Sequence, residues 1–198
     1  SSLSDIRSTF DELINSNTKK IEQLRTKIKK LKVLNKSLEE LSSNIGIYSF
    51  CVMPKCYRMM EKINADTESH KMGAAISSPM FSFGNIGYKT HFDDEHNPTQ
   101  RYMSFVIWEN LINTAPVDDN IENLPFVGLC ECISTTALGH GNGIIEFDLD
   151  GMIKHASSLG YGHLGYYYAF YIYAAPGGNS YGNGIVDYYK IYMPVKKQ

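Results

Sequence analysis

The sequence contains no uninterrupted apolar run of the ~18 residues that a membrane-spanning helix needs, so we expect no membrane span. Its start lacks the charged-then-apolar order of a secretory signal peptide. It opens on Ser-Ser rather than Met, from which we expect a fragment of a longer protein. Only four of its 198 residues are cysteine, spaced C-x4-C and C-x-C. That usage indicates reduced structural thiols and a cytoplasmic location, with a zinc site completed by a histidine as the alternative.

Recognisable catalytic motifs are also missing. No G-x-S-x-G turn is present, and no cysteine lies in a familiar Cys-His motif. The glycine-rich GHGNG stretch (139–143) lacks the Lys-Ser/Thr pair that completes a phosphate loop, and we interpret it as a turn. We therefore predict that the protein is not an enzyme and that it binds no cofactor.

Two short stretches contain potential metal ligands. HFDDEH (91–96) gathers two histidines and three carboxylates that could bind a divalent cation, although a turn before Asn97-Pro98 is the simpler interpretation. DLDG (148–151) begins like a calcium loop but lacks the third oxygen ligand and the closing glutamate. We predict no metal site from either stretch.

The charge is unevenly distributed along the chain. Residues 1–45 hold nine Lys or Arg and six Asp or Glu, a balance of +3, whereas residues 46–198 have a balance of −5. The chain is 43% apolar, which is enough for a buried core. We divide it into a coiled-coil stalk over 1–45 and a β head over 46–198.

Residues 3–45 keep a 3-4 spacing of apolar residues over about six heptads, without Pro or Gly. This pattern is typical of a coiled coil, with a single amphipathic helix packed on its own domain as the alternative. The a and d residues that we expect to hold copies of the chain together are Ile14, Asn17, Ile21, Leu24, Ile28, Leu31, Asn35 and Leu38.

The number of strands in the coil stays open between a homodimer and a homotrimer. Ile at a with Leu at d, and Asn35 at a, favour two strands, whereas Asn17 at d fits three. Basic residues occupy the flanking e and g positions, so identical parallel strands repel each other and the coil alone should be only modestly stable. Because no aromatic residues alternate with these cations, we do not expect nucleic-acid binding.

Beyond Gly46 the sequence is typical of β structure. Strand-forming residues alternate or run together at 46–52, 87–92, 101–108, 126–133, 144–149, 165–174 and 185–195. The alternation within 126–133 places Cys130 and Cys132 on one core-facing side. The Gly- and Asn-rich stretch 174–184 is expected to join the last two strands as a hairpin. Some seven or eight strands with short polar turns predict an all-β antiparallel sandwich.

Several motifs of the head, taken in order, resemble those of TRAF-type (MATH) domains. GIYSFCV (46–52) is similar to the family's first strand, with Phe50 where the family has Trp. SSPMFSFGNIGYK (77–89) resembles its S-P-x-F … G-Y-K segment, and YMSFVIW (102–108) and LPFVGLCECI (124–133) are similar to two later strands. The resemblance implies a β-sandwich head behind a coiled coil.

The resemblance also implies an oligomeric adaptor or scaffold in signalling, whose head binds extended peptide segments of partner proteins by strand addition. Tyr102 matches a groove tyrosine of the family, and the strand start at Gly143, Ile144 and Ile145 is a second candidate for peptide contact. The stretch 90–95 lacks the Arg and Tyr that hold a receptor peptide in the family.

Two other functions remain open. One is a trimeric viral or phage attachment head, or a lectin-like receptor-binding head, on a fibre stalk. The other is a purely structural head that caps the coil and sets its register.

Overall fold

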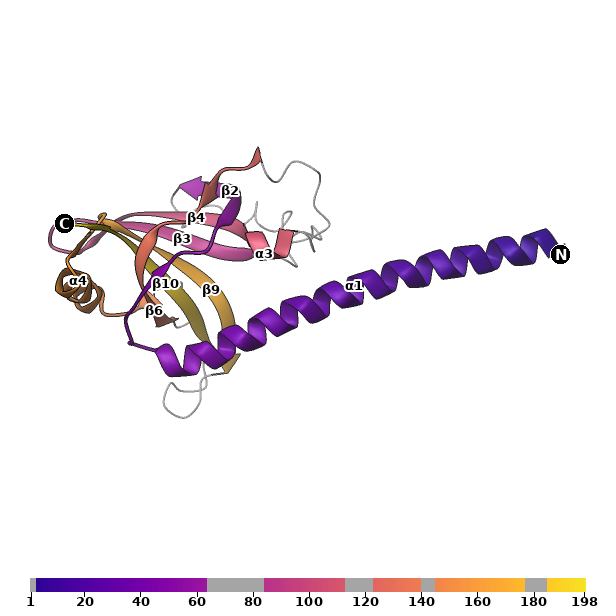
Figure 1. The fold of residues 1–198 in the computed structure, drawn as a ribbon, viewed down its shortest axis with the longest axis horizontal. Helices are drawn as coiled ribbons and strands as arrows, with labels where there is room; N and C mark the ends of the chain where they lie inside the picture. Colours follow the sequence, from indigo (N-terminus) through magenta and orange to yellow (C-terminus); the bar gives the residue numbers. More distant parts are fainter. Residues whose placement is uncertain (1–2, 64–83, 113–122, 140–144, 177–184) are drawn as a thin grey trace. The chain divides into compact units, whose positions relative to one another are not determined.

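The computed structural model describes residues 3–63, 84–112, 123–139, 145–176 and 185–198 (Figure 1). Contacts within the chain divide it into two compact units, Ser1–Lys36 and Ser37–Gln198. None of the described helices is long and apolar enough to cross a membrane, which agrees with the prediction from the sequence.

Helix α1 (Leu3–Asn44) confirms the predicted helical segment. Its 42 residues include no Pro or Gly, the two residues that most disfavour a helix interior. Gly46, just beyond the helix, has a φ of 70°, which glycine adopts without steric cost. The end of the helix is therefore set where the sequence predicts it.

The strands of the described chain form a single 10-stranded sheet, and every pairing in it is antiparallel. Eight strands follow each other in the order β1-β6-β10-β9-β3-β4-β2-β5, while β7 pairs with β6 and β8 pairs with β10. The strands are β1 (Ser49–Val52), β2 (Cys56–Ile63), β3 (Asn85–Phe92), β4 (Pro98–Trp108), β5 (Phe126–Val127), β6 (Glu131–Gly139), β7 (Ile145–Glu146), β8 (Tyr161–His163), β9 (Tyr166–Pro176) and β10 (Ile185–Lys197).

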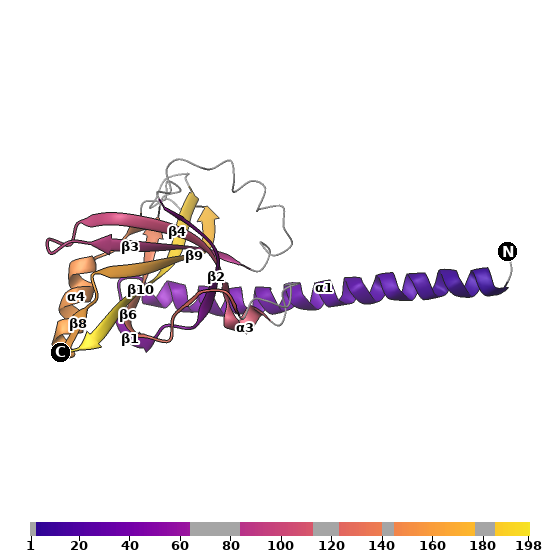
Figure 2. The same cartoon turned by 90° about the horizontal axis from the view of Figure 1, so that it is seen from above.

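The predicted all-β antiparallel sandwich of TRAF/MATH type is wrong, because the strands do not divide into two stacked sheets. The one sheet instead curls into half a barrel (Figure 1), and Figure 2 shows the curl from above. The 13-residue strand β10 is the physical reason, since it pairs with β6, β8 and β9 and so joins strands that a sandwich would separate. Its register against β9 shifts between Tyr188 and Tyr189, an irregularity of the kind that bends a strand.

Helix α4 (Leu149–Ser158) packs against one face of the sheet, in a region for which we expected only β structure. Asp148 caps it, because its side chain accepts a hydrogen bond of 2.8 Å from the backbone N–H of Gly151. Met152 and Ala156 are buried against the strands, in a cluster with Phe92, Ile133, Ala137, Tyr167, Ala169, Tyr189, Ile191, Met193 and Val195. Helix α4 therefore covers the face of the sheet that a second sheet would cover in the predicted sandwich. A second short helix, α3 (Glu109–Ile112), follows β4.

The other face of the sheet buries a smaller cluster, formed by Met53, Cys56, Val106, Cys132, Phe170 and Tyr192. Successive strand residues point to opposite faces, so Ala169 belongs to the α4 side and Phe170 to this cluster. In β4 the residues Ser104, Phe105, Val106 and Ile107 are all buried, so this part of the strand is covered on both faces.

The segment 126–133 differs from its predicted strand. Gly128 and Leu129 have positive φ angles of 114° and 56°, so the chain turns between β5 and β6 instead of alternating. A Cβ at position 128 would lie 2.3 Å from the carbonyl oxygen of Pro54, which leaves room only for glycine.

Other strand predictions have mixed outcomes. The pairing of Ile185 with Pro176 confirms that β9 and β10 form a hairpin, although its turn lies outside the described residues. Of the predicted strand 144–149, the described part contains a strand at Ile145–Glu146, and helix α4 begins at Leu149. Strands β2 and β8 were not predicted. In the stretch 77–89, residues 77–83 lie outside the described part, and Gly87-Tyr88-Lys89 lies within β3.

Candidate ligand-binding hollow

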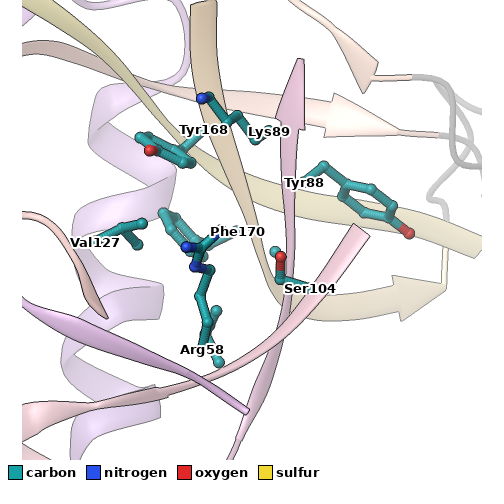
Figure 3. Close-up of a pocket in the computed structure, with 9 residues that line it drawn as sticks. Arg58, Tyr88, Lys89, Ser104, Val127, Tyr168 and Phe170 are labelled. Carbon is teal, nitrogen blue, oxygen red and sulfur yellow. The ribbon is translucent and has the colours of Figure 1, made fainter. Parts of the chain in front are cut away.

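A hollow lies on the sheet where β9, β3, β4 and β2 are neighbours (Figure 3). It has a volume of about 260 Å³, part of which is open to solvent. Its lining residues are Arg58, Gly87, Tyr88, Lys89, Ser104, Val106, Val127, Tyr168 and Phe170.

The register of three strands shapes the hollow. Gly87 on β3 is paired with Phe170 on β9 and with Ser104 on β4. A Cβ at position 87 would lie 2.8 Å from Cε1 of Phe170, closer than packed carbon atoms come. The missing side chain of Gly87 therefore lets the ring of Phe170 lie against β3.

Phe170 belongs to a group of packed aromatic rings. Its ring is stacked with that of Tyr168, with 6.0 Å between centroids and 21° between planes. The ring of Trp108, the single tryptophan of the chain, lies 4.8 Å from Phe170, and the ring of Tyr192 lies 6.0 Å away. The rings of Tyr168 and Phe170 line the hollow and form its aromatic wall, whereas those of Trp108 and Tyr192 pack on Phe170 at interplanar angles of 59° and 65°.

Two cationic side chains lie beside this wall. Arg58 extends from β2 to the ring of Phe170, and Lys89 extends from β3 toward Tyr168 (Figure 3). The Nζ atom of Lys89 also lies 4.2 Å from the centroid of the Tyr166 ring, which is a cation-π contact. The lining, as far as the chain is described, contains no Asp or Glu. The lining thus contributes two cationic side chains to the hollow.

The two lining tyrosines differ in role. Burial raises the pKa of Tyr168 above its ordinary value, with further contributions from Tyr166 and Cys130. Its phenol is therefore protonated at neutral pH and can donate a hydrogen bond. Tyr88 points to the other side of the sheet (Figure 3), where the guanidinium of Arg101 lies 4.0 Å from its ring centroid.

The residues predicted for peptide contact lie on different strands. Tyr102 on β4 is paired with Lys89 and packs edge-on against His91, with 5.9 Å between ring centroids. It therefore lies in the same row of strand pairs as the lining residue Lys89, but it does not itself line the hollow. Ile145 on β7 packs against the α4 side of the sheet. Gly143 and Ile144 lie outside the described residues, so this prediction stays untested.

The residues predicted for self-association lie on α1. The apolar ones are not covered by the chain itself: the exposed fraction is 61% for Ile14, 50% for Ile21, 57% for Leu24, 53% for Ile28 and 63% for Leu31. Asn17 and Asn35 are exposed as well. Leu38 lies in α1, but its side chain is outside the described part. A row of large exposed apolar side chains at this spacing can be covered by another helix.

The two stretches with potential metal ligands have structural roles. The Asp93 carboxylate accepts hydrogen bonds from the backbone N–H groups of Glu95 and Asn97, at 3.0 and 2.8 Å, and closes the turn between β3 and β4. In the second stretch, Asp148 caps α4. Within the described ranges, no group of three or more His, Cys, Asp or Glu side chains is arranged to hold a metal ion.

Comparisons with known proteins assign neither a family nor a function to the chain. A scan against protein-family models finds no match, and neither does a search of curated proteins. Among solved structures, the chain is similar to the EcmrR C-terminal domain, with 13% identity and a TM-score of 0.44 over 76% of this chain and 98% of that one. It is also similar to a hydrolase from Listeria innocua, with 11% identity and a TM-score of 0.42 over 81% and 97%. Likenesses this distant assign no function to the chain, and they do not indicate a TRAF-type domain.

Sequence reasoning missed most of the hollow. Arg58 lies on β2, which was not predicted, so nothing marked it as a neighbour of β4. Tyr168 and Phe170 lie within the long aromatic run 165–174, where every second residue shares a face. That alternation was the available signal, but it does not tell which face lies beside the two cations.

Proposed function

We propose that the protein is a self-associating binding protein, in which α1 joins copies of the chain and the hollow of the head binds a single-ring aromatic anion. The observation that carries this proposal is the composition of the lining, where Arg58 and Lys89 lie beside the rings of Tyr168 and Phe170. We expect no covalent chemistry at this site.

An aryl carboxylate fits both features of the hollow. Its ring can stack on the wall formed by Tyr168 and Phe170. This contact removes apolar surface of the ligand from water and involves no charged group. Its carboxylate can accept two parallel hydrogen bonds from the guanidinium of Arg58, while the ammonium of Lys89 adds a second positive charge. A single ring that carries one carboxylate is the smallest ligand that can make both contacts.

Self-association through α1 rests on its exposed apolar row. Five large side chains between Ile14 and Leu31 are at least half exposed in the single chain. Covering each of them removes an apolar side chain from water, worth about 1.5–3 kcal/mol when burial is complete. Joining two or three heads raises the local concentration of binding sites, which strengthens binding to a partner that carries several copies of the ligand group.

A matched set of ligands tests the binding proposal. Benzoate, benzamide and benzylammonium have similar size but carry negative, zero and positive charge. We expect benzoate alone to raise the melting temperature of the full chain in a thermal-shift assay, because only it pairs with Arg58 and Lys89. The same increase with all three ligands would contradict the proposal.

Two variants and a matched control assign the effect to the hollow. Arg58→Gln and Lys89→Gln should each remove the benzoate effect, since each takes away one positive charge from the lining. Lys154→Gln removes a charge from the exposed surface of α4 and should keep the effect. Loss of the effect in the Lys154 variant would mean that the anion responds to net charge and not to the hollow.

A second candidate function is binding of an extended peptide, which is favoured by the position of β1. This strand is at one end of the strand order and exposes Phe50 and Val52, at 42% and 59%. A peptide strand could pair with its outer edge, as in other proteins that bind peptides by strand addition. A charge at such an edge blocks pairing, so Val52→Lys should abolish binding on a peptide array while Arg58→Gln keeps it.

A parallel glycan array tests the attachment-head alternative, and binding to glycans alone would contradict the peptide proposal.

A further inference from the structure

Thiols gather in the cluster that borders the hollow. The Sγ atoms of Cys130 and Cys132 are 3.7 Å apart, at the distance of a thiol-thiol hydrogen bond. Cys51 is paired with Cys132 across β1 and β6, and Cys56 is fully buried in the same cluster. All four cysteines are in the free thiol form.

The backbone holds Cys130 in this position. Gly128 and Leu129 have positive φ angles, which turn the chain just before Cys130. Two hydrogen bonds with Met53 fix the turn: the N–H of Met53 donates to the carbonyl oxygen of Cys130 at 2.9 Å, and the N–H of Leu129 donates to that of Met53 at 2.8 Å. A non-glycine residue with positive φ is uncommon, so the approach of the two thiols depends on a specific turn.

The two thiols differ in access and acidity. Cys132 is fully buried, whereas Cys130 is only half-buried and can be reached from solvent. The hydrogen bond between them lowers the pKa of Cys130, and the same contact together with burial raises the pKa of Cys132. Cys130 is therefore the thiol that more readily forms a thiolate, the form that reacts with oxidants.

We propose that Cys130 and Cys132 are a dithiol site that a peroxide converts into a reversible disulfide beside the hollow. The thiolate of Cys130 attacks one oxygen of hydrogen peroxide, breaks the O–O bond and becomes a sulfenic acid, while the other oxygen leaves as hydroxide and takes a proton to form water. Cys132 then loses its proton and attacks the sulfenic sulfur, which releases a second water. Overall, two thiols and one peroxide give one disulfide and two waters.

The other two cysteines are poorer partners for Cys130. Burial raises the pKa of the Cys56 thiol to about 12, so it is almost entirely protonated at neutral pH and reacts slowly. Cys51 lies opposite Cys132 rather than next to Cys130. It can therefore compete with Cys132 only in the second step, the attack on the sulfenic acid of Cys130. The expected product is therefore the Cys130–Cys132 disulfide.

Oxidation at this site should change the hollow. Bond formation shortens the distance between the two sulfur atoms from 3.7 Å to about 2.05 Å, and we expect the turn before Cys130 to shift with it. Val127, which begins that turn, lines the hollow. The site is independent of which ligand the hollow binds, because it depends only on the two thiols and the turn.

The test is oxidation of the full chain with a small excess of hydrogen peroxide, followed by alkylation of the remaining thiols in denaturant and peptide mass spectrometry. We expect Cys130 and Cys132 to escape alkylation and their peptide to have lost two hydrogen atoms, while Cys51 and Cys56 are alkylated. Dithiothreitol should restore alkylation at both sites. A disulfide between Cys51 and Cys132, or equal oxidation of all four residues, would overturn the proposal.

Three variants separate the steps. Cys132→Ser should stop the reaction at a sulfenic acid on Cys130, which a cyclic 1,3-dione traps as a stable adduct. Cys130→Ser should slow peroxide consumption about tenfold, since the remaining thiols are less acidic or less accessible. Cys51→Ser leaves the pair intact and should still form the disulfide. The peptide mass spectrometry of the oxidised wild-type chain shows which disulfide forms without any substitution. It therefore tests the proposal even if one of the variants folds less well.

Discussion

Gly87 and Phe170 are paired across β3 and β9, and the ring of Phe170 occupies the space that a side chain at position 87 would need. This close approach positions the aromatic wall next to Lys89, the residue two places further along β3. The packing of the aromatic wall against β3 thus depends on one glycine.

Replacing this glycine should damage the hollow and the stability of the head together. Gly87→Ala forces the Phe170 ring to move, and overpacking of this kind costs about 1–3 kcal/mol. Urea unfolding should give a correspondingly lower free energy of unfolding, and the emission of Trp108, which packs on Phe170, should shift. The control is Gly162→Ala, where the new Cβ meets only the flexible end of Gln198. Equal stability of the two variants would argue against the tight packing of Phe170 on β3.

Self-association should depend on the a and d row of α1. Ile21→Lys places a charge in the apolar row, whereas Gln23→Lys adds the same charge at an exposed position off the row. Light scattering on the full chain should give a multiple of the 22.3 kDa chain mass for the wild type and the Gln23 variant, and the single-chain mass for the Ile21 variant. Identical masses for both variants would show that α1 does not join the copies.

The basic flanks of the heptad should make self-association sensitive to salt. In a parallel coil, Lys27 at g faces Lys32 at e of the other copy, so the two repel each other. Lys27→Glu converts the repulsion into attraction, worth about 0.2–0.5 kcal/mol per pair, and should lower the dissociation constant measured by analytical ultracentrifugation.

Raising the salt concentration screens the repulsion and should likewise strengthen wild-type association. Raising the salt concentration should weaken the self-association of the Lys27→Glu variant or leave it unchanged. Association of the wild type that weakens with salt would point to an antiparallel coil or to an acidic partner strand.

The cap of α4 should make the head sensitive to acid. The backbone N–H of Gly151, followed by the hydroxyl of Tyr48, donates to Asp148 and lowers the pKa of its carboxyl. A carboxyl whose pKa is lower in the folded state than in the unfolded state stabilises the fold above its unfolded pKa of about 3.9. This stabilisation is lost as the pH falls through the lower folded value.

Asp148→Asn keeps an oxygen acceptor at the cap but cannot titrate. The difference in melting temperature between the wild type and this variant should therefore shrink between pH 5 and about pH 2. Asp148→Ala removes the acceptor and should lower the melting temperature at neutral pH, where Asn retains most of the cap. A difference that does not vary with pH would show that the Asp148 charge does not contribute to stability.

The sequence predicts the local elements of this fold better than their arrangement. Helix α1 has a regular heptad and ends near Gly46, and β4 has a near-continuous apolar run, so both can be recognised from nearby residues alone. The choice between two sheets and one depends on β10 and its three partner strands, which lie far away in the sequence. Helix α4 was missed because its first residue, Leu149, was included in the strand predicted over 144–149 and the chain beyond Gly46 was interpreted as β structure.

The hollow was even less predictable. Its lining comes from β2, β3, β4, β5 and β9, and the charge of Arg58 becomes relevant only when β2 pairs with β4. Cys130 and Cys132 were expected on one side because of strand alternation, whereas their contact depends on the turn at Gly128 and Leu129. Such turns follow from backbone conformations that no periodic pattern encodes.

Titration of the full chain with benzoate, followed by the fluorescence of Trp108, tests the central claim most directly. Trp108 is the only tryptophan and its ring contacts Phe170 in the wall of the hollow, so its emission should change and saturate at one benzoate per chain. Benzamide should have no effect at the same concentrations, and Arg58→Gln should abolish the change. A fluorescence response that does not saturate, or that persists unchanged in the Arg58 variant, would contradict the assignment of the hollow as a site for an aromatic anion.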